Sequence, residues 1–305
     1  MSEVNYRQGV IGGDENLPVA EVHGVYPTID PKVHFEKASF KGKVVLVTGA
    51  SRGIGQQTAV DYARAGATVV IVSRQQEALD ETKNIILKVV PQAQVLAIPV
   101  DVKNSEQAAK AVETAVERFG RLDVLIANAG TISPFTDKLE DKDPLQWWNV
   151  LEVNLFGVFN FVRAAGIDRP SLVHLKKVNG YVVAISSVGA QYRNLFGSDY
   201  CISKHALGRL VEFVRLEYPE IKTFSLHPGG VRTQLAVDGK LDPRLTLDDP
   251  PELAAATMLY LTSGNADWLS GRYVSSNWDL GEVERDWKSK IVEQGGLVSK
   301  LFIPK

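Results

Sequence analysis

Tyr200 and Lys204 form a pair whose residue types and spacing could do chemistry. They lie four residues apart in this 305-residue chain, so on a helix their side chains share one face. A tyrosine hydroxyl has a pKa of about 10, and a nearby ammonium lowers that pKa by favouring the phenolate. The pair could therefore serve as a general acid and base. Alone it is weak evidence, because a tyrosine and a lysine at this spacing are common on exposed helices.

Ser187 strengthens this interpretation. It comes 13 residues before Tyr200 and ends the apolar segment GYVVAIS, which has the length of a buried strand. From that position its hydroxyl could hydrogen-bond a substrate oxygen and orient it toward the tyrosine.

A glycine-interrupted turn, TGASRGIG, follows the first long apolar segment and contains Thr48, Gly49, Gly53 and Gly55. Glycine allows the backbone to turn sharply and to approach a pyrophosphate closely. The helix expected from Ile54 would present unpaired N–H groups and the positive end of its dipole to the phosphates. Because the turn lies between a strand and a helix, it predicts a dinucleotide site.

The elements that must position these residues alternate along the chain. Strands are expected in KVVLVTG, ATVVIVSR, QVLAIPVD, LDVLIANAG, GYVVAISS, IKTFSLHPG and RYVSS, and helices near 54–65, 75–89, 104–119, 144–165, 200–218 and 250–262. This alternation predicts a single-domain α/β fold, a doubly wound parallel sheet of the Rossmann type with helices on both faces. Ligands of such sheets bind beyond the carboxyl ends of the strands.

With the spacing Thr-Gly-x-x-x-Gly-x-Gly, residues 40–280 resemble the short-chain dehydrogenase/reductase family. Further matches follow in order: Asp101, Asn128-Ala129-Gly130, Asn154, Ser187, Tyr200-x-x-x-Lys204 and HPGGVRT at 227–233. The resemblance implies four catalytic residues, namely Asn154, Ser187, Tyr200 and Lys204. It implies that Ser187, rather than Ser186, is the catalytic serine, and that Asn154 holds a water molecule that takes part in a proton relay.

The second strand ends Val72-Ser73-Arg74 without an acidic residue, and Arg52 lies in the glycine turn. An acid there would bind a ribose 2′-hydroxyl, whereas arginine attracts a 2′-phosphate, so NADP(H) is the expected cofactor. The resemblance implies that Asp101 accepts the adenine amine, that Asn128 fixes the backbone near the adenosine ribose, and that Thr233 bonds the phosphate or carboxamide. The full predicted cofactor set is Thr48, Gly49, Ser51, Arg52, Gly53, Ile54, Gly55, Ser73, Arg74, Asp101, Val102, Asn128, Ala129, Gly130, Tyr200, Lys204, Pro228, Gly229, Val231 and Thr233.

The expected function is hydride transfer between NADP(H) and a carbonyl or secondary alcohol, in the reducing direction. Segments 131–138, 188–198 and 232–250 should line the substrate pocket, including Thr131, Val188, Gln191, Tyr192 and Asn194. Their mixed character suits a medium-sized organic carbonyl such as a secondary metabolite, although a sugar or a steroid would fit nearly as well. Two alternatives stay open: an isomerase or dehydratase on the same scaffold, and a non-catalytic NADP(H)-binding protein.

Composition narrows the partners. A net charge of −2 with 23% charged residues gives no global attraction to nucleic acid or to an anionic membrane. The single cysteine, Cys201, rules out an internal disulfide and indicates a reducing compartment. The five histidines show no metal-ligand spacing, so no metal is expected. Neither a targeting segment nor a stretch of about 18 apolar residues is apparent, so the protein is expected to be cytoplasmic.

Two regions fall outside the resemblance. Residues 1–40 are expected to form an extended arm whose aromatic residues Tyr6, Tyr26, Phe35 and Phe40 dock on the main body, residues 41–281, or on a neighbouring subunit. Residues 282–305 form a C-terminal extension, either a surface tail or a lid or subunit contact. The resemblance also implies a homodimer or homotetramer assembled through the helices near 144–165 and 200–218.

Overall fold

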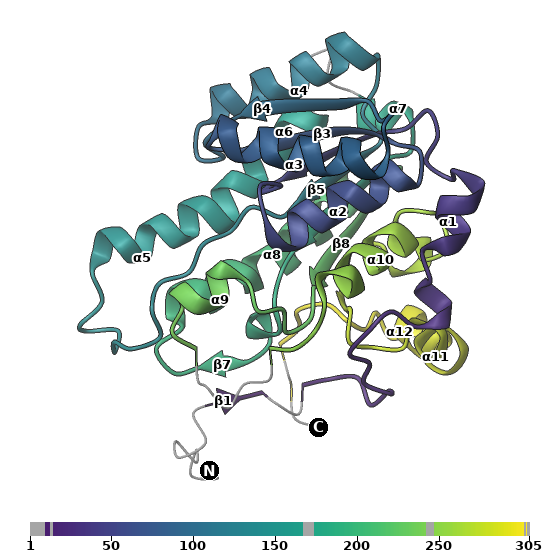
Figure 1. Cartoon of the computed structure of the whole chain (residues 1–305). Coiled ribbons are helices and arrows are strands. Elements are labelled where there is room, and N and C mark those ends of the chain that lie inside the picture. The colour runs from purple at the N-terminus through teal and green to yellow at the C-terminus, as the bar shows by residue number, and fades with distance from the viewer. Residues whose placement is uncertain (1–9, 13–14, 167–173, 242–246, 302, 304–305) are drawn as a thin grey trace.

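A twisted parallel sheet forms the centre of the molecule (Figure 1). The computed structural model describes residues 10–12, 15–166, 174–241, 247–301 and 303. Within them seven strands pair in the order β4-β3-β2-β5-β6-β8-β9, and every neighbouring pair is parallel. The strands are β2 (Val44–Thr48), β3 (Thr68–Ser73), β4 (Val95–Pro99), β5 (Val124–Ala127), β6 (Tyr181–Ile185), β8 (Lys222–His227) and β9 (Arg272–Ser275). The predicted doubly wound sheet is confirmed.

Helices cover both faces of the sheet, as the parallel connections require. One face carries α2 (Gly53–Arg64), α3 (Gln76–Val89) and α10 (Pro251–Leu261). The other carries α4 (Ser105–Phe119), α6 (Gly157–Gly166) and α8 (Ser198–Glu217), with α5 (Pro144–Leu151) continuing α6 outward (Figure 1). Shorter helices are α7 (His174–Lys177), α9 (Gln234–Asp238) and the 3-10 helices η4 (Val188–Ala190) and η5 (Asp267–Leu269).

Alternation along the strands builds the two halves of the core. In β2, Val45 and Val47 pack with α2 and α10, whereas Leu46 packs on the opposite face with α4 and α6. Side chains of successive strand residues point to opposite faces, so a strand covered on both sides needs apolar residues throughout. All five residues of β2 are buried for this reason.

The strand order reverses between β2 and β5, whose neighbours β3 and β6 extend the sheet in opposite directions. At such a switch point the connections leave toward opposite faces and open a crevice at the carboxyl edge. The turn after β2 and the segment after β5 meet at this edge, so the glycine turn and Asn128-Ala129-Gly130 lie side by side, as a shared cofactor site requires.

The expected helix over 144–165 is interrupted in its middle. Between α5 and α6, residues Glu152–Phe156 form a π-helix, η3, which contains Asn154. A π segment widens the helix locally and often marks a functional position.

The N-terminal segment is only partly extended, which corrects the expected arm. It contains β1 (Val10–Ile11), the 3-10 helix η2 (Pro27–Ile29) and α1 (Lys32–Lys37). Of its aromatic residues, Phe40 is fully buried in the core, and Tyr26 and Phe35 pack against the core. Tyr6 lies outside the described residues.

The C-terminal segment folds back on the body. It begins with α11 (Leu280–Glu282), continues through the π-helix η6 (Val283–Trp287) and ends its helical part with α12 (Lys288–Glu293). Val283 and Ile291 are buried in the core, and the amide of Tyr273 on β9 donates to the carbonyl of Leu297 at 2.9 Å. The segment therefore covers part of the edge strand β9.

Candidate active site and cofactor site

Ser187, Tyr200 and Lys204 come together at the carboxyl edge of the sheet, as predicted. Ser187 follows β6 and caps η4, where its Oγ accepts from the amide of Gly189 at 3.1 Å. Tyr200 lies in the first turn of α8, and its phenol hydrogen-bonds Ser187. The Nζ of Lys204, one turn later, lies 5.6 Å from the centre of the tyrosine ring.

The environment keeps this tyrosine protonated. Burial raises the pKa of Tyr200 to about 12, although the hydrogen bond with Ser187 opposes the shift. Burial also lowers the pKa of Lys204 to about 8, and its Nζ donates to the carbonyl of Ile185 at 2.7 Å. The sequence argument expected the ammonium to lower the pKa of the tyrosine. Burial has the largest effect on this pKa, and the Lys204 ammonium is not among the groups that shift it, which corrects the expectation.

Ser186 plays a different part from Ser187. It is buried, and its Oγ donates to the carbonyl of Lys204 at 3.0 Å. This bond ties the end of β6 to α8, which agrees with a structural role.

Asn154 is fully buried and its amide is satisfied by the protein. The Oδ1 atom accepts from the amide of Thr131 at 2.7 Å, and Nδ2 donates to the carbonyl of Thr131 and to Ser203 Oγ, both at 2.9 Å. A side chain on Gly130 would lie 3.4 Å from Asn154 Oδ1 and 3.5 Å from Lys204 Nζ. Glycine thus leaves room beside the amide and the ammonium, and the proton-relay role of Asn154 stays a prediction.

A buried ion pair anchors the start of α8, and the sequence reasoning missed it. The Nζ of Lys142 lies 3.5 Å from Asp199 Oδ1 and donates to Ser133 Oγ at 3.1 Å. Ser133 also hydrogen-bonds Asp199, which is fully buried and accepts from the amide of Tyr200 at 2.9 Å. Only the adjacency of Asp199 and Tyr200 in the sequence could have signalled this network.

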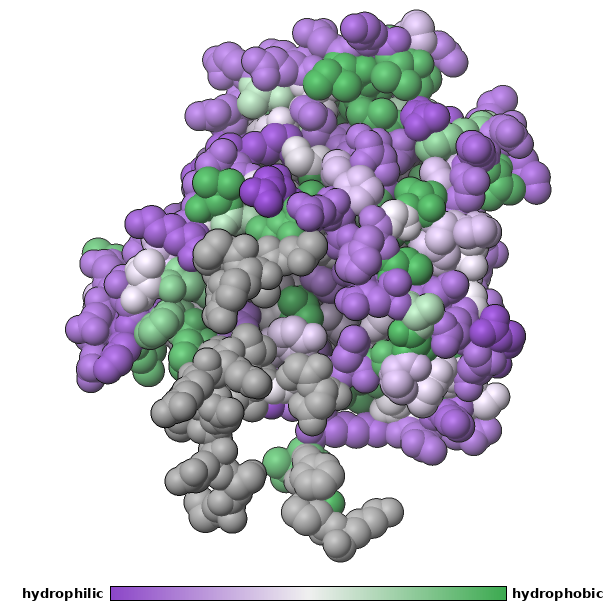
Figure 2. All heavy atoms as spheres, turned by 60° about the horizontal axis from the view of Figure 1, so that its bottom comes forward, coloured by the Kyte–Doolittle hydropathy of each residue, from purple (hydrophilic) through white to green (hydrophobic). Residues whose placement is uncertain are grey.

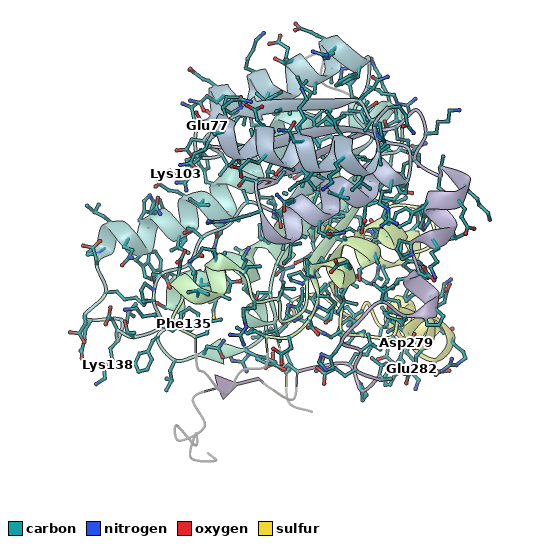
Figure 3. All side chains as sticks on the ribbon, in the orientation of Figure 1. Glu77, Lys103, Phe135, Lys138, Asp279 and Glu282 are labelled. Carbon is teal, nitrogen blue, oxygen red and sulfur yellow. The ribbon has the colours of Figure 1, made fainter. Side chains whose placement is uncertain are left out.

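Phe135 forms a wall beside the tyrosine. It lies in the loop after β5 (Figure 3), and its ring meets that of Tyr200 edge-on with centroids 6.1 Å apart. A side chain on Gly197 would come within 2.6 Å of the Phe135 ring. The predicted lining segment 131–138 therefore reaches Tyr200.

Two glycines of the cofactor turn are required by close packing. Gly49 has a φ of 66°, and a Cβ there would lie 2.8 Å from the Cα of Ala129. A Cβ on Gly55 would lie 2.4 Å from the carbonyl oxygen of Gly49. The turn can therefore pass close to β5 and direct the N-terminus of α2, which begins at Gly53, toward the crevice.

Thr48 and Asn128 lock this turn to the neighbouring strand. Thr48 Oγ1 accepts from the amides of Asn128 and Ala129, both at 3.0 Å. The amide side chain of Asn128 donates to the carbonyls of Thr48 and Gly49 at 2.9 and 3.1 Å. These hydrogen bonds of Thr48 and Asn128 fix the backbone at the switch point, where Asn128 was expected to fix it.

Arg52 and Arg74 are exposed beside this turn. Arg52 is the N-cap residue of α2, and Arg74 follows Ser73 at the end of β3. Within the described part of the chain neither guanidinium has an ion-pair or hydrogen-bond partner. Two unpaired cations suit a phosphate group, so these residues fit the cofactor predicted from the sequence.

The remaining cofactor residues differ in surroundings. Asp101 accepts from the amide of Lys103 at 3.0 Å, and the side chain of Val102 is buried in the core. Thr233 caps α9, and its methyl group would lie 3.4 Å from a Cβ on Gly53, so the segment after β8 packs next to the start of α2. Of the other predicted residues, Ser51 lies in the turn after β2, Ile54 lies in the first turn of α2, and Pro228, Gly229 and Val231 lie in the segment after β8.

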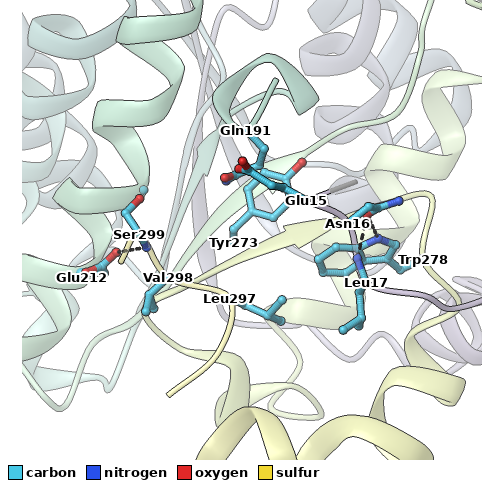
Figure 4. Close-up of a pocket in the computed structure, with 11 residues that line it drawn as sticks. Glu15, Asn16, Leu17, Gln191, Glu212, Tyr273, Trp278, Leu297, Val298 and Ser299 are labelled. Atoms are coloured by element: carbon cyan, nitrogen blue, oxygen red, sulfur yellow. Dashed lines mark hydrogen bonds between the residues drawn. The ribbon is translucent and has the colours of Figure 1, made fainter. Parts of the chain in front are cut away.

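The predicted substrate residues do not share one place. Thr131 is held by Asn154, Val188 begins η4 beside Ser187, and Asn194 lies in β7 (Arg193–Asn194), which pairs with β1 of the arm. Gln191 instead lines a cavity of about 320 Å³ between the arm and the C-terminal segment (Figure 4). None of the residues lining that cavity belongs to the predicted catalytic set.

Two features of the surface bear on partners. Large apolar residues are exposed along α5, η3, α6 and α8, namely Leu145, Trp148, Phe156, Phe159, Ile202, Phe213 and Leu216. Figure 2 shows hydrophobic atoms on the side of the molecule where α5 lies, whereas most of that view is hydrophilic.

Among the described residues no helix is long and apolar enough to cross a membrane, and no cluster of three possible metal ligands occurs.

Comparison with known proteins agrees with this geometry. The sequence model of the short chain dehydrogenase family matches residues 43–242. The short chain dehydrogenase mpl6 of Monascus purpureus is 36% identical over 293 residues, which are 93% of this chain and 96% of that protein.

Two solved structures share the fold. An alcohol dehydrogenase from the archaeon Thermococcus sibiricus, complexed with 5-hydroxy-NADP, has a TM-score of 0.64 and 28% identity over 76% of this chain and 95% of that one. Carveol dehydrogenase from Mycobacterium avium, in complex with NAD, has a TM-score of 0.67 and 25% identity over 77% and 96% of the two chains. Structures of this kind therefore carry either nicotinamide dinucleotide.

Proposed function

This chain belongs to the short chain dehydrogenase family of oxidoreductases, and from that premise we propose that it is an NADP(H)-dependent reductase of a small organic carbonyl. The observation that carries the proposal is the hydrogen-bonded pair of Ser187 and a protonated Tyr200, with Lys204 one turn behind. These three groups lie at the carboxyl edge of the sheet, next to a turn built for a dinucleotide.

In this proposal bound NADPH supplies a hydride to the carbonyl carbon. Tyr200 donates its phenolic proton to the carbonyl oxygen, and Ser187 holds that oxygen by a hydrogen bond while negative charge develops on it. The Lys204 ammonium stabilises the phenolate that remains, since the Nζ lies near the ring. Asn154 keeps the segment after β5 in place through Thr131.

The preference for NADP(H) over NAD(H) rests on Arg52 and Arg74. Both are exposed and have no partner among the described residues, and β3 ends without a carboxylate that would repel a 2′-phosphate. The reducing direction is part of this proposal, and Tyr200, whose pKa burial raises to about 12, is protonated near neutral pH as that direction requires.

The substrate in this proposal is a medium-sized carbonyl compound, such as an aromatic or partly polar metabolite. Support comes from Phe135 beside Tyr200 and from Val188, which begins η4 next to Ser187. We also propose a cytoplasmic homo-oligomer that buries the apolar side chains of α5 and α8, since such exposed groups gain from removal from water.

The proposal is tested by replacing Tyr200 with phenylalanine. NADPH oxidation is followed at 340 nm with a panel of ketones and aldehydes, and NADPH binding is measured separately by fluorescence. Loss of a general acid typically costs about 100- to 10,000-fold in rate, so turnover should nearly disappear while NADPH binding persists. Tyr218→Phe, at the far end of the same helix, is the matched control and should keep its activity.

Two results would redirect the assignment. Turnover retained by Tyr200→Phe would exclude the tyrosine as the proton donor. Tight NADPH binding without NADPH consumption on any carbonyl or alcohol would favour an isomerase, a dehydratase or a non-catalytic binding protein.

A further inference from the structure

Asp249 connects the N-terminal arm to the turn that follows β8. It is 7% exposed, and its Oδ2 accepts from the amide of Gly230 at 2.6 Å and from Nδ2 of Asn277 at 2.9 Å. Its other oxygen, Oδ1, lies 2.8 Å from Nδ1 of His23. One carboxylate therefore gathers hydrogen bonds from three separate parts of the chain.

The carboxylate is held in its charged form. Burial opposes its ionisation, but the hydrogen bonds from Asn277, Gly230 and His23 outweigh burial and keep the pKa of Asp249 below its usual value. A charged acceptor makes stronger hydrogen bonds than a neutral one.

The turn itself is shaped around this side chain. Gly229 has a φ of 92°, and a Cβ there would lie 2.8 Å from Asp249 Oδ2. The amide of Asp249 also donates to the carbonyl of Gly230 at 3.1 Å. Asp249 thus holds the turn through both its backbone and its side chain.

The arm brings His23 to this carboxylate by running alongside the segment after β9. The amide of Val22 donates to the carbonyl of Asn277, and Asn277 Nδ2 donates to the carbonyl of Val22, both at 2.8 Å. Three residues before His23 in the arm, the carbonyl of Ala20 accepts from the amide of Asp279 at 3.1 Å (Asp279 is labelled in Figure 3).

His23 is a contact rather than a core residue, since its side chain is 61% exposed. Its hydrogen bond to Asp249 spans 226 positions of sequence. The residue therefore contributes little apolar burial, and its described polar contact is the one to Asp249.

We propose that His23 and Asp249 are positioning residues through which the N-terminal arm fixes the Pro228–Gly230 turn in the shape that receives the nicotinamide end of the cofactor. This inference rests on the proposed function, because that function places the cofactor against this turn. The arm thereby becomes part of the cofactor site although it lies outside the family's matched region, 43–242.

The test compares four full-length proteins: wild type, His23→Ala, His23→Asn and Val25→Ala. Asparagine can place a neutral N–H donor near the position of the histidine Nδ1, so it should restore the contact. Val25 is 41% exposed and lies next to the contact in the arm, so it serves as the matched control. Amide hydrogen exchange of residues 229–231 is measured without ligand, and NADPH affinity is measured by fluorescence.

We expect His23→Ala to raise exchange at Gly230 and to weaken NADPH binding about 3- to 10-fold, with wild-type behaviour in His23→Asn and Val25→Ala. Asp249→Asn should have a larger effect, because an amide cannot accept from all three donors. Unchanged exchange and affinity in both His23→Ala and Asp249→Asn would overturn the inference. If the wild type binds no NADPH, the proposed function fails, whereas exchange in the ligand-free protein still decides whether the arm holds the turn.

Discussion

Replacing both Arg52 and Arg74 with alanine should remove most of the discrimination between NADPH and NADH. The two guanidinium groups flank the glycine turn, are exposed, and have no partner in the described part of the chain. A hydrogen bond to a charged group contributes about 1.5–3 kcal/mol. Because solvent screens exposed charges, the low end applies to each residue, so the pair contributes about 3 kcal/mol.

This free energy corresponds to about a 150-fold change, since 1.36 kcal/mol is a factor of ten in rate. The expected result is a fall of that order in kcat/KM for NADPH with kcat/KM for NADH changed less than about threefold. Steady-state kinetics with both cofactors at one fixed carbonyl concentration measure it. High salt should reduce the preference of the wild type, because salt screens phosphate contacts at a surface.

Arg118→Ala supplies the control for loss of a surface arginine, because Arg118 lies in the last turn of α4. It should leave both values unchanged. If the double variant loses NADPH and NADH activity equally, the arginines act on the shared part of the two cofactors, and the reasoning about the 2′-phosphate is refuted.

Three further outcomes are expected. In the reducing direction kcat/KM should fall above about pH 8, because Lys204 then loses the charge that stabilises the phenolate while Tyr200, with a pKa of about 12, stays protonated; a flat profile to pH 10 would contradict this. Lys142→Met should lower the free energy of unfolding by about 3–5 kcal/mol in urea titrations, since it leaves Asp199 charged and unpaired in the core. Burial raises the pKa of Asp61 from 3.8 to about 6, so ionisation of this carboxyl destabilises the fold as the pH rises. The stability of Asp61→Asn relative to wild type should therefore increase from pH 4 to pH 7, by up to about 3 kcal/mol. A stability difference that is independent of pH would refute this prediction.

The sheet could be predicted because its signals are local. Each strand is a short apolar segment, and β2 is buried along its whole length, so the pattern needs no knowledge of distant contacts. The turn after β2 was predictable for the same reason, since its glycines directly follow an apolar strand in the sequence. The family resemblance then predicted that Ser187, Tyr200 and Lys204 belong to one site, and the structure brings these residues together.

The features that were not predicted depend on contacts between distant residues. Lys142 and Asp199 are 57 positions apart, and no periodicity links them. The π-helix contains Asn154, whose side chain hydrogen-bonds the backbone of Thr131, whereas helix propensity alone shows only that asparagine is a poor helix former. The pKa of Tyr200 was misjudged because the spacing to Lys204 shows the nearby charge and does not show the burial.

The N-terminal arm connects the loop after Ser187 with the loop after β8. Through β1 and the ion pair of Glu15 with Arg193, 2.6 Å apart, it binds the loop after Ser187. Through His23 it binds Asp249 at the end of the other loop. A rearrangement of either loop would therefore have to break or move contacts with the arm. Because these contacts lie outside residues 43–242, a substrate preference transferred by exchanging the two loops alone would be incomplete, and the arm would have to be exchanged with them.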